Sequence, residues 1–146
     1  ILIVDDGDAG FTATSGWTTY VGAGAQGDFA YKGAGSGAET ASWTFTGLAP
    51  GQYRVSATWQ AYSNRVTDAP YTVLDGSSVM GTVLVNQRES PAGFLEDGSW
   101  WQDLGGAYDV VTGSLTVELN DSAGPSGSYL VADAVRLERL GSLPPN

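Results

Sequence analysis

The chain has 146 residues, with 16 acidic residues against six basic ones, a net charge of −10, and neither cysteine nor histidine. Without cysteine there are no disulfides and no thiol chemistry, and without histidine the commonest general base is missing. The acidic balance repels phosphate groups, which excludes nucleic acid as a favoured partner, and no apolar stretch is long enough for membrane insertion.

Apolar residues recur with a period of two along most of the chain, which indicates strands rather than helices. The glycine-rich segment 22–37 is expected to be a loop with room for one short strand, and the polar segment 90–99 is expected to be an exposed loop. Strands are predicted, in chain order, at residues 1–4, within 11–20, at 41–46, 53–60, 71–74 and 79–86, within 100–111, at 115–120 and at 128–138.

Two of the turns are predicted to close hairpins. The strands on either side of Ala49-Pro50-Gly51 alternate large apolar with polar side chains, and those on either side of Asp75-Gly76 flank a dipeptide typical of tight hairpin turns. About eight to ten short strands with such turns predict an all-β fold, an antiparallel β-sandwich of the jelly-roll, galactose-binding-like type.

The chain is interpreted as one module with a short tail. Residues 1–140 form the single β-sandwich module, and residues 141–146, Gly-Ser-Leu-Pro-Pro-Asn, are interpreted as a C-terminal linker. Because the sequence starts inside an apolar strand, shows no signal peptide and ends in this linker, we expect a module cut from a longer polypeptide.

The segment 128–138 places a carboxylate where an apolar side chain is expected. Side chains alternate between two faces of a strand, and Asp133 lies in the middle of the face that the apolar residues share. The apolar residues of that face are Tyr129, Val131, Val135 and Leu137. An unpaired buried carboxylate is unfavourable by several kcal/mol or stays protonated, so Asp133 is expected to have a compensating partner: a buried arginine, backbone N–H groups or a metal ion.

One interpretation of Asp133 is a metal site formed with the N-terminal acidic residues. Asp5, Asp6 and Asp8 offer carboxylates within one turn, and Asp133 reaches them if the first and last strands are neighbours. Calcium, which takes about six to eight oxygen ligands, suits such a set as a structural ion. In the alternative interpretation Asp133 forms an ion pair with a buried Arg65, and Asp5 and Asp8 cap turns.

The aromatic residues fall into two groups. Those in regular alternation or in the motifs below are expected in the core, namely Trp17, Trp43, Trp59 and Trp101. Trp100, Tyr62, Tyr20 and Phe94 lie in or beside loops, so they are the candidates for an exposed ligand-binding surface. Their flat apolar faces suit the stacking of sugar rings, although such residues also mark protein interfaces.

Nothing in the sequence indicates an enzyme. No glutamate stands in an apolar context that would raise its pKa for acid catalysis, as a glycosidase requires. Serine nucleophiles have no histidine partner, and the glycines follow no phosphate-binding arrangement.

Several stretches together carry a resemblance that covers nearly the whole chain. They are residues 3–11 (IVDDGDAGF) with Trp17, 41–45 (ASWTF), 50–55 (PGQYRV), 63–73 (SNRVTDAPYTV), 85–87 (VNQ), 101–105 (WQDLG) and 131–136 (VADAVR). In this order they resemble the golvesin/xanthan-lyase carbohydrate-binding-like domain, an all-β module appended to secreted bacterial enzymes and surface proteins. The segment 90–98 departs from the compact form of that family.

The resemblance implies a non-catalytic accessory module of a larger secreted or cell-surface bacterial protein, serving carbohydrate binding or surface attachment. The partners expected are a polysaccharide or cell-surface glycan and other domains of the same polypeptide. The alternative is a structural spacer or adhesion domain without a small-molecule ligand, stabilised by bound calcium.

Overall fold

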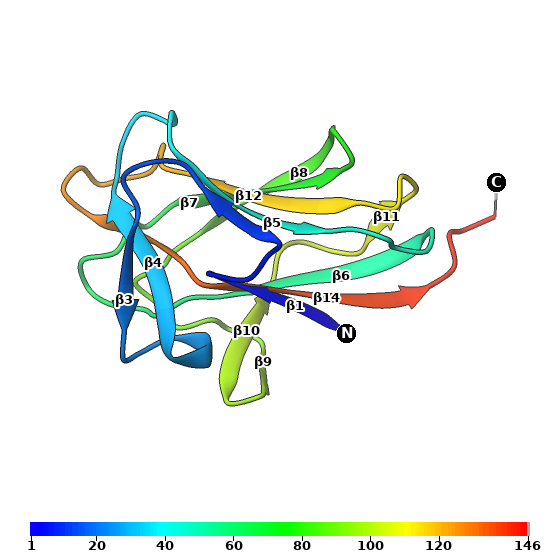
Figure 1. Cartoon of the computed structure of the whole chain (residues 1–146), viewed down its shortest axis with the longest axis horizontal. Helices are drawn as coiled ribbons and strands as arrows, with labels where there is room; N and C mark the ends of the chain where they lie inside the picture. Colours follow the sequence, from blue (N-terminus) through cyan, green and yellow to red (C-terminus); the bar gives the residue numbers. More distant parts are fainter. Residues whose placement is uncertain (146) are drawn as a thin grey trace.

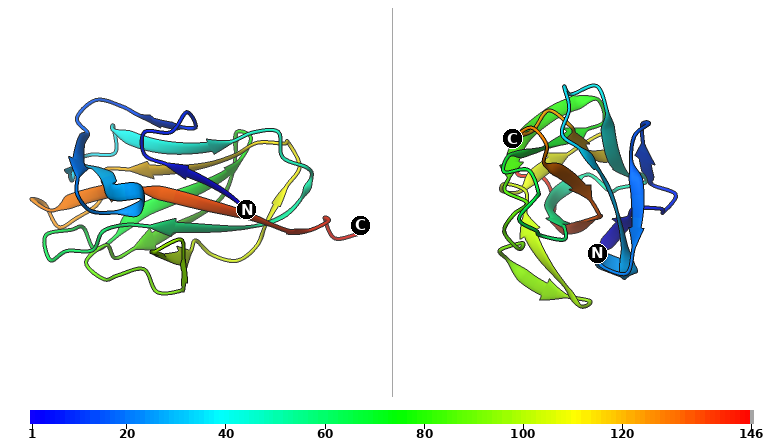
Figure 2. Two further views of the ribbon diagram at one scale, coloured as in Figure 1. Left: turned by 60° about the horizontal axis from the view of Figure 1, so that its bottom comes forward. Right: turned by 90° about the vertical axis from the view of Figure 1, so that its left-hand side faces the viewer.

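Alternating apolar side chains build two antiparallel sheets, which lie as two layers (Figure 1 and Figure 2) and enclose a common core. This computed structural model describes residues 1–145. The first sheet has the strand order β1 (Leu2–Asp5), β14 (Ala134–Gly141), β6 (Gly51–Thr58), β10 (Ser99–Asp103) and β9 (Phe94–Glu96). Strand β11 (Tyr108–Val110) also pairs with β6. The second has the order β2 (Phe11–Ala13), β5 (Thr40–Phe45), β12 (Leu115–Asn120), β7 (Ala69–Asp75) and β8 (Ser78–Val85). The predicted all-β, antiparallel, jelly-roll sandwich is confirmed.

A third, smaller sheet lies at the end of the sandwich opposite the C-terminus, at the left of Figure 1. Its order is β13 (Tyr129–Ala132), β4 (Asp28–Gly33) and β3 (Thr18–Val21), and a 3₁₀ turn at Ala25–Gly27 precedes β4. Only Asp133 separates β13 from β14, so this residue joins the small sheet to the first large one. Residues 1–145 contain no helix long and apolar enough to span a membrane.

The core between the two large sheets is built from the apolar faces of their central strands. Trp43 of β5 is fully buried and stacks on Tyr71 of β7, with ring centroids 6.1 Å apart. Trp59 and Trp101 are buried as predicted, whereas Trp17 packs against the core only partly buried. Alternation therefore identified Trp43 and Trp59 as core residues, because each large apolar side chain in their strands alternates with a polar one, whereas Trp101 was predicted from its motif.

The hairpin predicted around Asp75-Gly76 is present, but the hairpin predicted around Ala49-Pro50-Gly51 is wrong. Strands β7 and β8 pair along their length with one register shift between Val73 and Leu74, and Gly76 lies in the turn at φ +59°. In contrast, β5 pairs with β2 and β12 while β6 pairs with β14, β10 and β11, so residues 46–50 cross from one sheet to the other. Alternation alone does not distinguish paired strands from strands that face each other across the core.

Two loop expectations also change. Part of the segment 90–99 forms β9, which pairs with β10. In the glycine-rich segment 22–37 the short strand for which the prediction left room is β4. Strand β14 ends at Gly141, one residue inside the predicted linker, and Asn146 lies outside the described residues. The three residues of β9, next to glycines, give little alternation, which explains why the pattern indicated a loop there.

Candidate functional site

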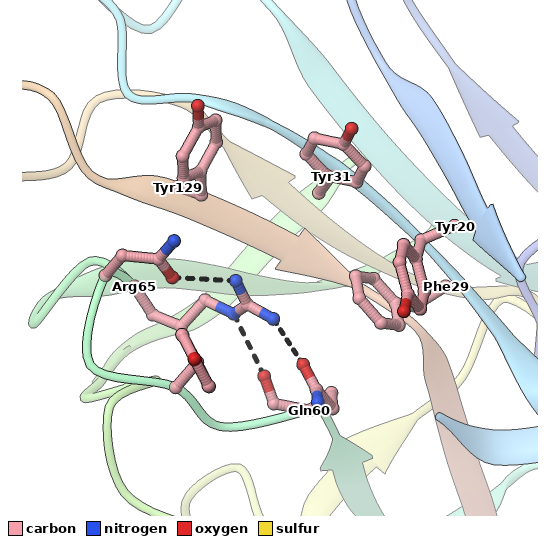
Figure 3. A pocket seen from close by; sticks show the side chains of 8 residues that line it. Tyr20, Phe29, Tyr31, Gln60, Arg65 and Tyr129 are labelled. Atoms are coloured by element: carbon pink, nitrogen blue, oxygen red, sulfur yellow. Dashed lines mark hydrogen bonds between the residues drawn. The ribbon is translucent and has the colours of Figure 1, made fainter. Parts of the chain in front are cut away.

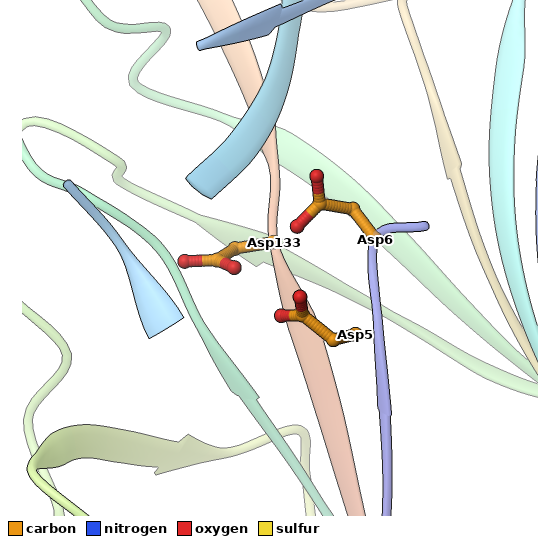
Figure 4. A group of neighbouring side chains, drawn as sticks. All are labelled: Asp5, Asp6 and Asp133. Atoms are coloured by element: carbon orange, nitrogen blue, oxygen red, sulfur yellow. The ribbon is translucent and has the colours of Figure 1, made fainter. Parts of the chain in front are cut away.

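The end of the sandwich near the small sheet contains two features of functional interest, an acidic cluster and an aromatic pocket. The cluster forms because β1 pairs with β14, with Asp5 opposite Ala134, so that the N-terminal aspartates lie beside Asp133. Carboxylate oxygens of Asp5, Asp6 and Asp133 all lie within 4.8 Å of one another. Figure 4 shows these three side chains converging from two neighbouring segments.

The three carboxyl groups of the acidic cluster (Asp5, Asp6 and Asp133) are buried and repel one another when charged. Burial is the main cause that raises the pKa of Asp5 to about 8, of Asp6 to about 7 and of Asp133 to about 9, and neighbouring aspartates add to each increase. One oxygen in each of these groups is buried without a hydrogen-bond partner. The cluster therefore has free ligand atoms for a cation, and a cation would favour the charged form of all three groups.

The surroundings of the acidic cluster fit a hard cation. The Ala25 N–H donates to Oδ2 of Asp133 at 2.8 Å, which fixes that carboxylate. A Cβ atom on Gly24 would lie 2.8 Å from the same oxygen, so glycine leaves the space that the carboxylate occupies. Asp28, the first residue of β4, adds its charge to Asp5 and Asp6 and also has a buried unpaired oxygen. An oxygen-rich set of this kind suits calcium.

Two sequence predictions about Asp133 need correction. Arg65 does not form the predicted ion pair with Asp133: its guanidinium bonds to Gln60 and Asn64 instead. Asp8 lies outside the acidic cluster, since it is exposed and its Oδ2 accepts the N–H of Asp5 at 2.8 Å. Asp8 thus caps a turn, a role that the alternative interpretation gave to it.

The aromatic pocket, about 450 Å³ in volume, lies over the small sheet. Its first wall is formed by side chains from three adjacent strands, Tyr20 of β3, Phe29 and Tyr31 of β4, and Tyr129 of β13. These rings contact one another in a row: Tyr20 stacks on Phe29 at 5.2 Å, and Tyr31 meets Tyr129 edge-on at 5.8 Å. Figure 3 shows the row of rings along one side of the pocket.

The second wall of the aromatic pocket comes from the loop between β6 and β7, through Gln60, Tyr62, Asn64 and Arg65. The Tyr129 N–H donates to the Asn64 carbonyl at 2.8 Å, which holds this loop beside β13. The Arg65 guanidinium lies 5.6 Å from the ring centroids of both Phe29 and Tyr62, so it sits between the walls. The pocket thus offers aromatic faces, two amides and one cation.

The structure divides the four predicted ligand-binding aromatics. Tyr20 and Tyr62 are 49% and 59% exposed and share the aromatic pocket. Trp100 is 51% exposed but lines a separate hollow of about 340 Å³ that also reaches Asp133. The ring of Phe94 is covered by the guanidinium groups of Arg54 and Arg136, at 4.2 and 4.9 Å, and so is not a free platform.

Sequence reasoning missed part of both features. Tyr129 was expected on the core face, yet it is 40% exposed in the aromatic pocket, whereas Val131, two residues later in β13, is fully buried. Phe29 and Tyr31 are two residues apart in β4 and so lie on the same face, a spacing that is a usable signal once β4 is recognised as a strand. Asp28 gave no signal, since it follows a glycine-rich segment without alternation.

Comparison with known proteins assigns the chain to a family. The family model of the Golvesin C-terminal domain matches residues 2–139. A xanthan lyase of Bacillus sp. (strain GL1) is 34% identical over 152 residues, which cover 96% of this chain and 15% of that protein. The solved Paenibacillus xanthan lyase is 30% identical with a TM-score of 0.74, over 97% of this chain and 13% of that one.

The fold is also shared with smaller proteins. A family 35 carbohydrate binding module from an environmental isolate has a TM-score of 0.63 at 14% identity, covering 99% of this chain and all of that module. This likeness concerns the fold alone. The chain spans about one seventh of the length of the lyases that it matches. On the family model and the lyase similarity, the chain belongs to the Golvesin C-terminal domain family.

Proposed function

We propose that this chain is a non-catalytic carbohydrate-binding module that attaches a larger secreted or cell-surface protein to polysaccharide. The observation that supports the proposal most strongly is the aromatic pocket with its exposed Tyr20, Tyr62 and Tyr129. Sugar rings present C–H faces that stack on aromatic rings, and amides such as those of Gln60 and Asn64 pair with hydroxyl groups. The similarity to part of a xanthan lyase supports a role beside a polysaccharide-degrading domain.

The chemistry of the aromatic pocket supports binding without catalysis. Hydrolysis of a glycosidic bond requires two carboxyl groups on either side of the bond. Among the described residues that line the pocket, none is an aspartate or glutamate. The buried carboxyl groups of the acidic cluster lie instead where β1 meets β14, which suits a structural ion.

The structural ion that we propose is calcium, bound by Asp5, Asp6 and Asp133, with Asp28 close enough to contribute. Calcium there would tie the N-terminus to the junction of β13 and β14 and to the start of β4. Because β4 contributes Phe29 and Tyr31 to the aromatic pocket, an ordered cluster would also support one wall of that pocket.

Affinity electrophoresis in native gels tests the binding proposal, since the net charge of −10 gives the protein good mobility. Gels containing a panel of soluble polysaccharides should retard the native protein in at least one case. Tyr62→Ala should weaken retention by about 30-fold, the equivalent of about 2 kcal/mol for a central aromatic contact.

Trp100→Ala is the matched control, because it removes an equally exposed aromatic outside the aromatic pocket, and it should leave retention unchanged. If no polysaccharide retards the folded protein, the spacer interpretation replaces this proposal. If Trp100→Ala abolishes retention and Tyr62→Ala does not, the binding site is elsewhere.

A further inference from the structure

Arg65 places a positive charge without a carboxylate partner between the walls of the aromatic pocket. Arg65 is only 8% exposed, and no carboxylate among the described residues lies within 4.0 Å of its guanidinium. Three other cations are neutralised: Lys32 pairs with Asp121, Arg54 pairs with Asp103, and Arg136 pairs with Glu96 and Glu138. In so acidic a chain, a buried arginine left without an acid is unusual chemistry for a structural residue.

The bonds that Arg65 makes leave room for a ligand. A guanidinium has five N–H donors. Three bonds are formed, from Nε to the Gln60 carbonyl at 3.1 Å, from Nη1 to Asn64 Oδ1 at 2.8 Å, and from Nη2 to Gln60 Oε1. One N–H on each terminal nitrogen therefore remains, which is the number that a bidentate carboxylate accepts.

The loop holds the guanidinium in place before any ligand arrives. The three acceptors fix the plane of the guanidinium (Figure 3). The backbone of the loop is tied down by the bond from the Tyr129 N–H to the Asn64 carbonyl. A second arginine, Arg88, donates from Nε to the Arg65 carbonyl at 2.6 Å and also has no carboxylate partner among residues 1–145. Positive potential is thus concentrated beside one pocket of an otherwise acidic protein.

We infer that the aromatic pocket selects sugars that carry a carboxylate, and that Arg65 is the residue that selects them. The inference rests on the proposed function, since the aromatic faces must first bind a sugar ring. Neutral sugars satisfy the amides but leave the guanidinium without a counter-charge, whereas an acidic sugar satisfies both. An arginine is needed for this, because the net charge of the chain repels acidic polysaccharide everywhere else.

Acidic polysaccharides and their carboxyl-reduced forms provide the test, because each pair has the same backbone and differs only in the carboxylate. Polygalacturonate, alginate and glucuronoxylan are run in affinity gels beside the reduced polymers. The native protein should bind at least one acidic polymer about 10- to 100-fold more tightly than its reduced form, the range expected for a hydrogen-bonded ion pair. This comparison needs no variant.

Variants then assign the preference to Arg65. Arg65→Gln should remove the preference for the acidic polymer while retaining binding to the reduced one, and Arg65→Lys should keep part of the preference. Arg139→Gln is the control, because it makes the same charge change near Pro50, away from the aromatic pocket. If Arg65 only held the loop together, Arg65→Gln would lower the melting temperature and weaken binding to the acidic and the reduced polymer equally. That result would overturn the inference.

The remaining outcomes are also decisive. Retention on neutral polymers alone would overturn the inference and leave the proposed function standing, whereas retention on none would overturn both. Equal retention on a sulfated neutral polysaccharide, or an unchanged preference in Arg65→Gln, would contradict the assignment to a carboxylate held by Arg65.

Discussion

Adding calcium to the chelated protein is expected to raise its melting temperature, because the ion would bind the folded acidic cluster and not the unfolded chain. At about 100 times the dissociation constant the stabilisation is about 2.7 kcal/mol. For a domain of this size, 1 kcal/mol shifts the melting temperature by about 2 to 4 °C, so the expected increase is about 5 to 11 °C.

The geometry of the acidic cluster explains why an ion should matter so much. With oxygens within 4.8 Å, each pair of charged carboxylates repels by about 3 kcal/mol at an effective dielectric constant of about 20. Without a cation the groups avoid this repulsion by retaining protons, which agrees with the raised pKa values of Asp5, Asp6 and Asp133. A divalent cation replaces repulsion with attraction.

Differential scanning fluorimetry at pH 7.5 in chelator and in millimolar calcium measures the effect. Asp133→Asn keeps the shape of the side chain and an acceptor for the Ala25 N–H, but it removes one charge. This variant should be at least as stable as the native protein in chelator and should not respond to calcium. An unchanged melting temperature of the native protein on calcium addition would refute the metal assignment.

Two further predictions concern groups away from the candidate sites. Burial alone would raise the pKa of Asp75, but hydrogen bonds from Thr112 and Val111 outweigh it and lower the pKa. Asp75 therefore stabilises the fold above about pH 4 and loses this effect as the pH falls further. Asp75→Asn should make the melting temperature fall less steeply with decreasing pH in the acid range, and an equally steep fall would contradict this. Gln87→Leu should lower the free energy of unfolding in urea by about 2 to 4 kcal/mol, because buried Gln87 bonds both the N–H and the carbonyl of Val131, and a loss below about 0.5 kcal/mol would show that those groups find other partners.

The fold was predictable where alternation was strong and a turn had a clear signature. Strands β7 and β8 have both, and their pairing was predicted correctly. The connection from β5 to β6 shows the limit, because a long turn with Pro50 and Gly51 suits a hairpin as well as a crossing between sheets. Choosing between them requires knowledge of the other neighbours of each strand, which lie far away in the sequence.

The acidic cluster was predictable in part because its evidence is local. An aspartate within an apolar strand had to have a partner, and neighbouring terminal strands were enough to bring Asp5 and Asp6 to Asp133. The aromatic pocket was harder to predict, since its residues come from three strands and one loop. Arg65 bonds to Gln60 and Asn64, which are near it in the sequence, but its position beside Phe29 depends on the distant small sheet, which no spacing in the sequence indicates.

Chemical-shift mapping by NMR, with an oligosaccharide released from a polysaccharide that retards the protein, tests the location of the binding site most directly. The account predicts that the largest shifts fall on the amides of Tyr62 and Arg65 in the loop, Tyr20 in β3 and Tyr129 in β13, and that the hairpin containing Trp100 stays unchanged. Shifts concentrated around Trp100, with none in the loop or the small sheet, would contradict it.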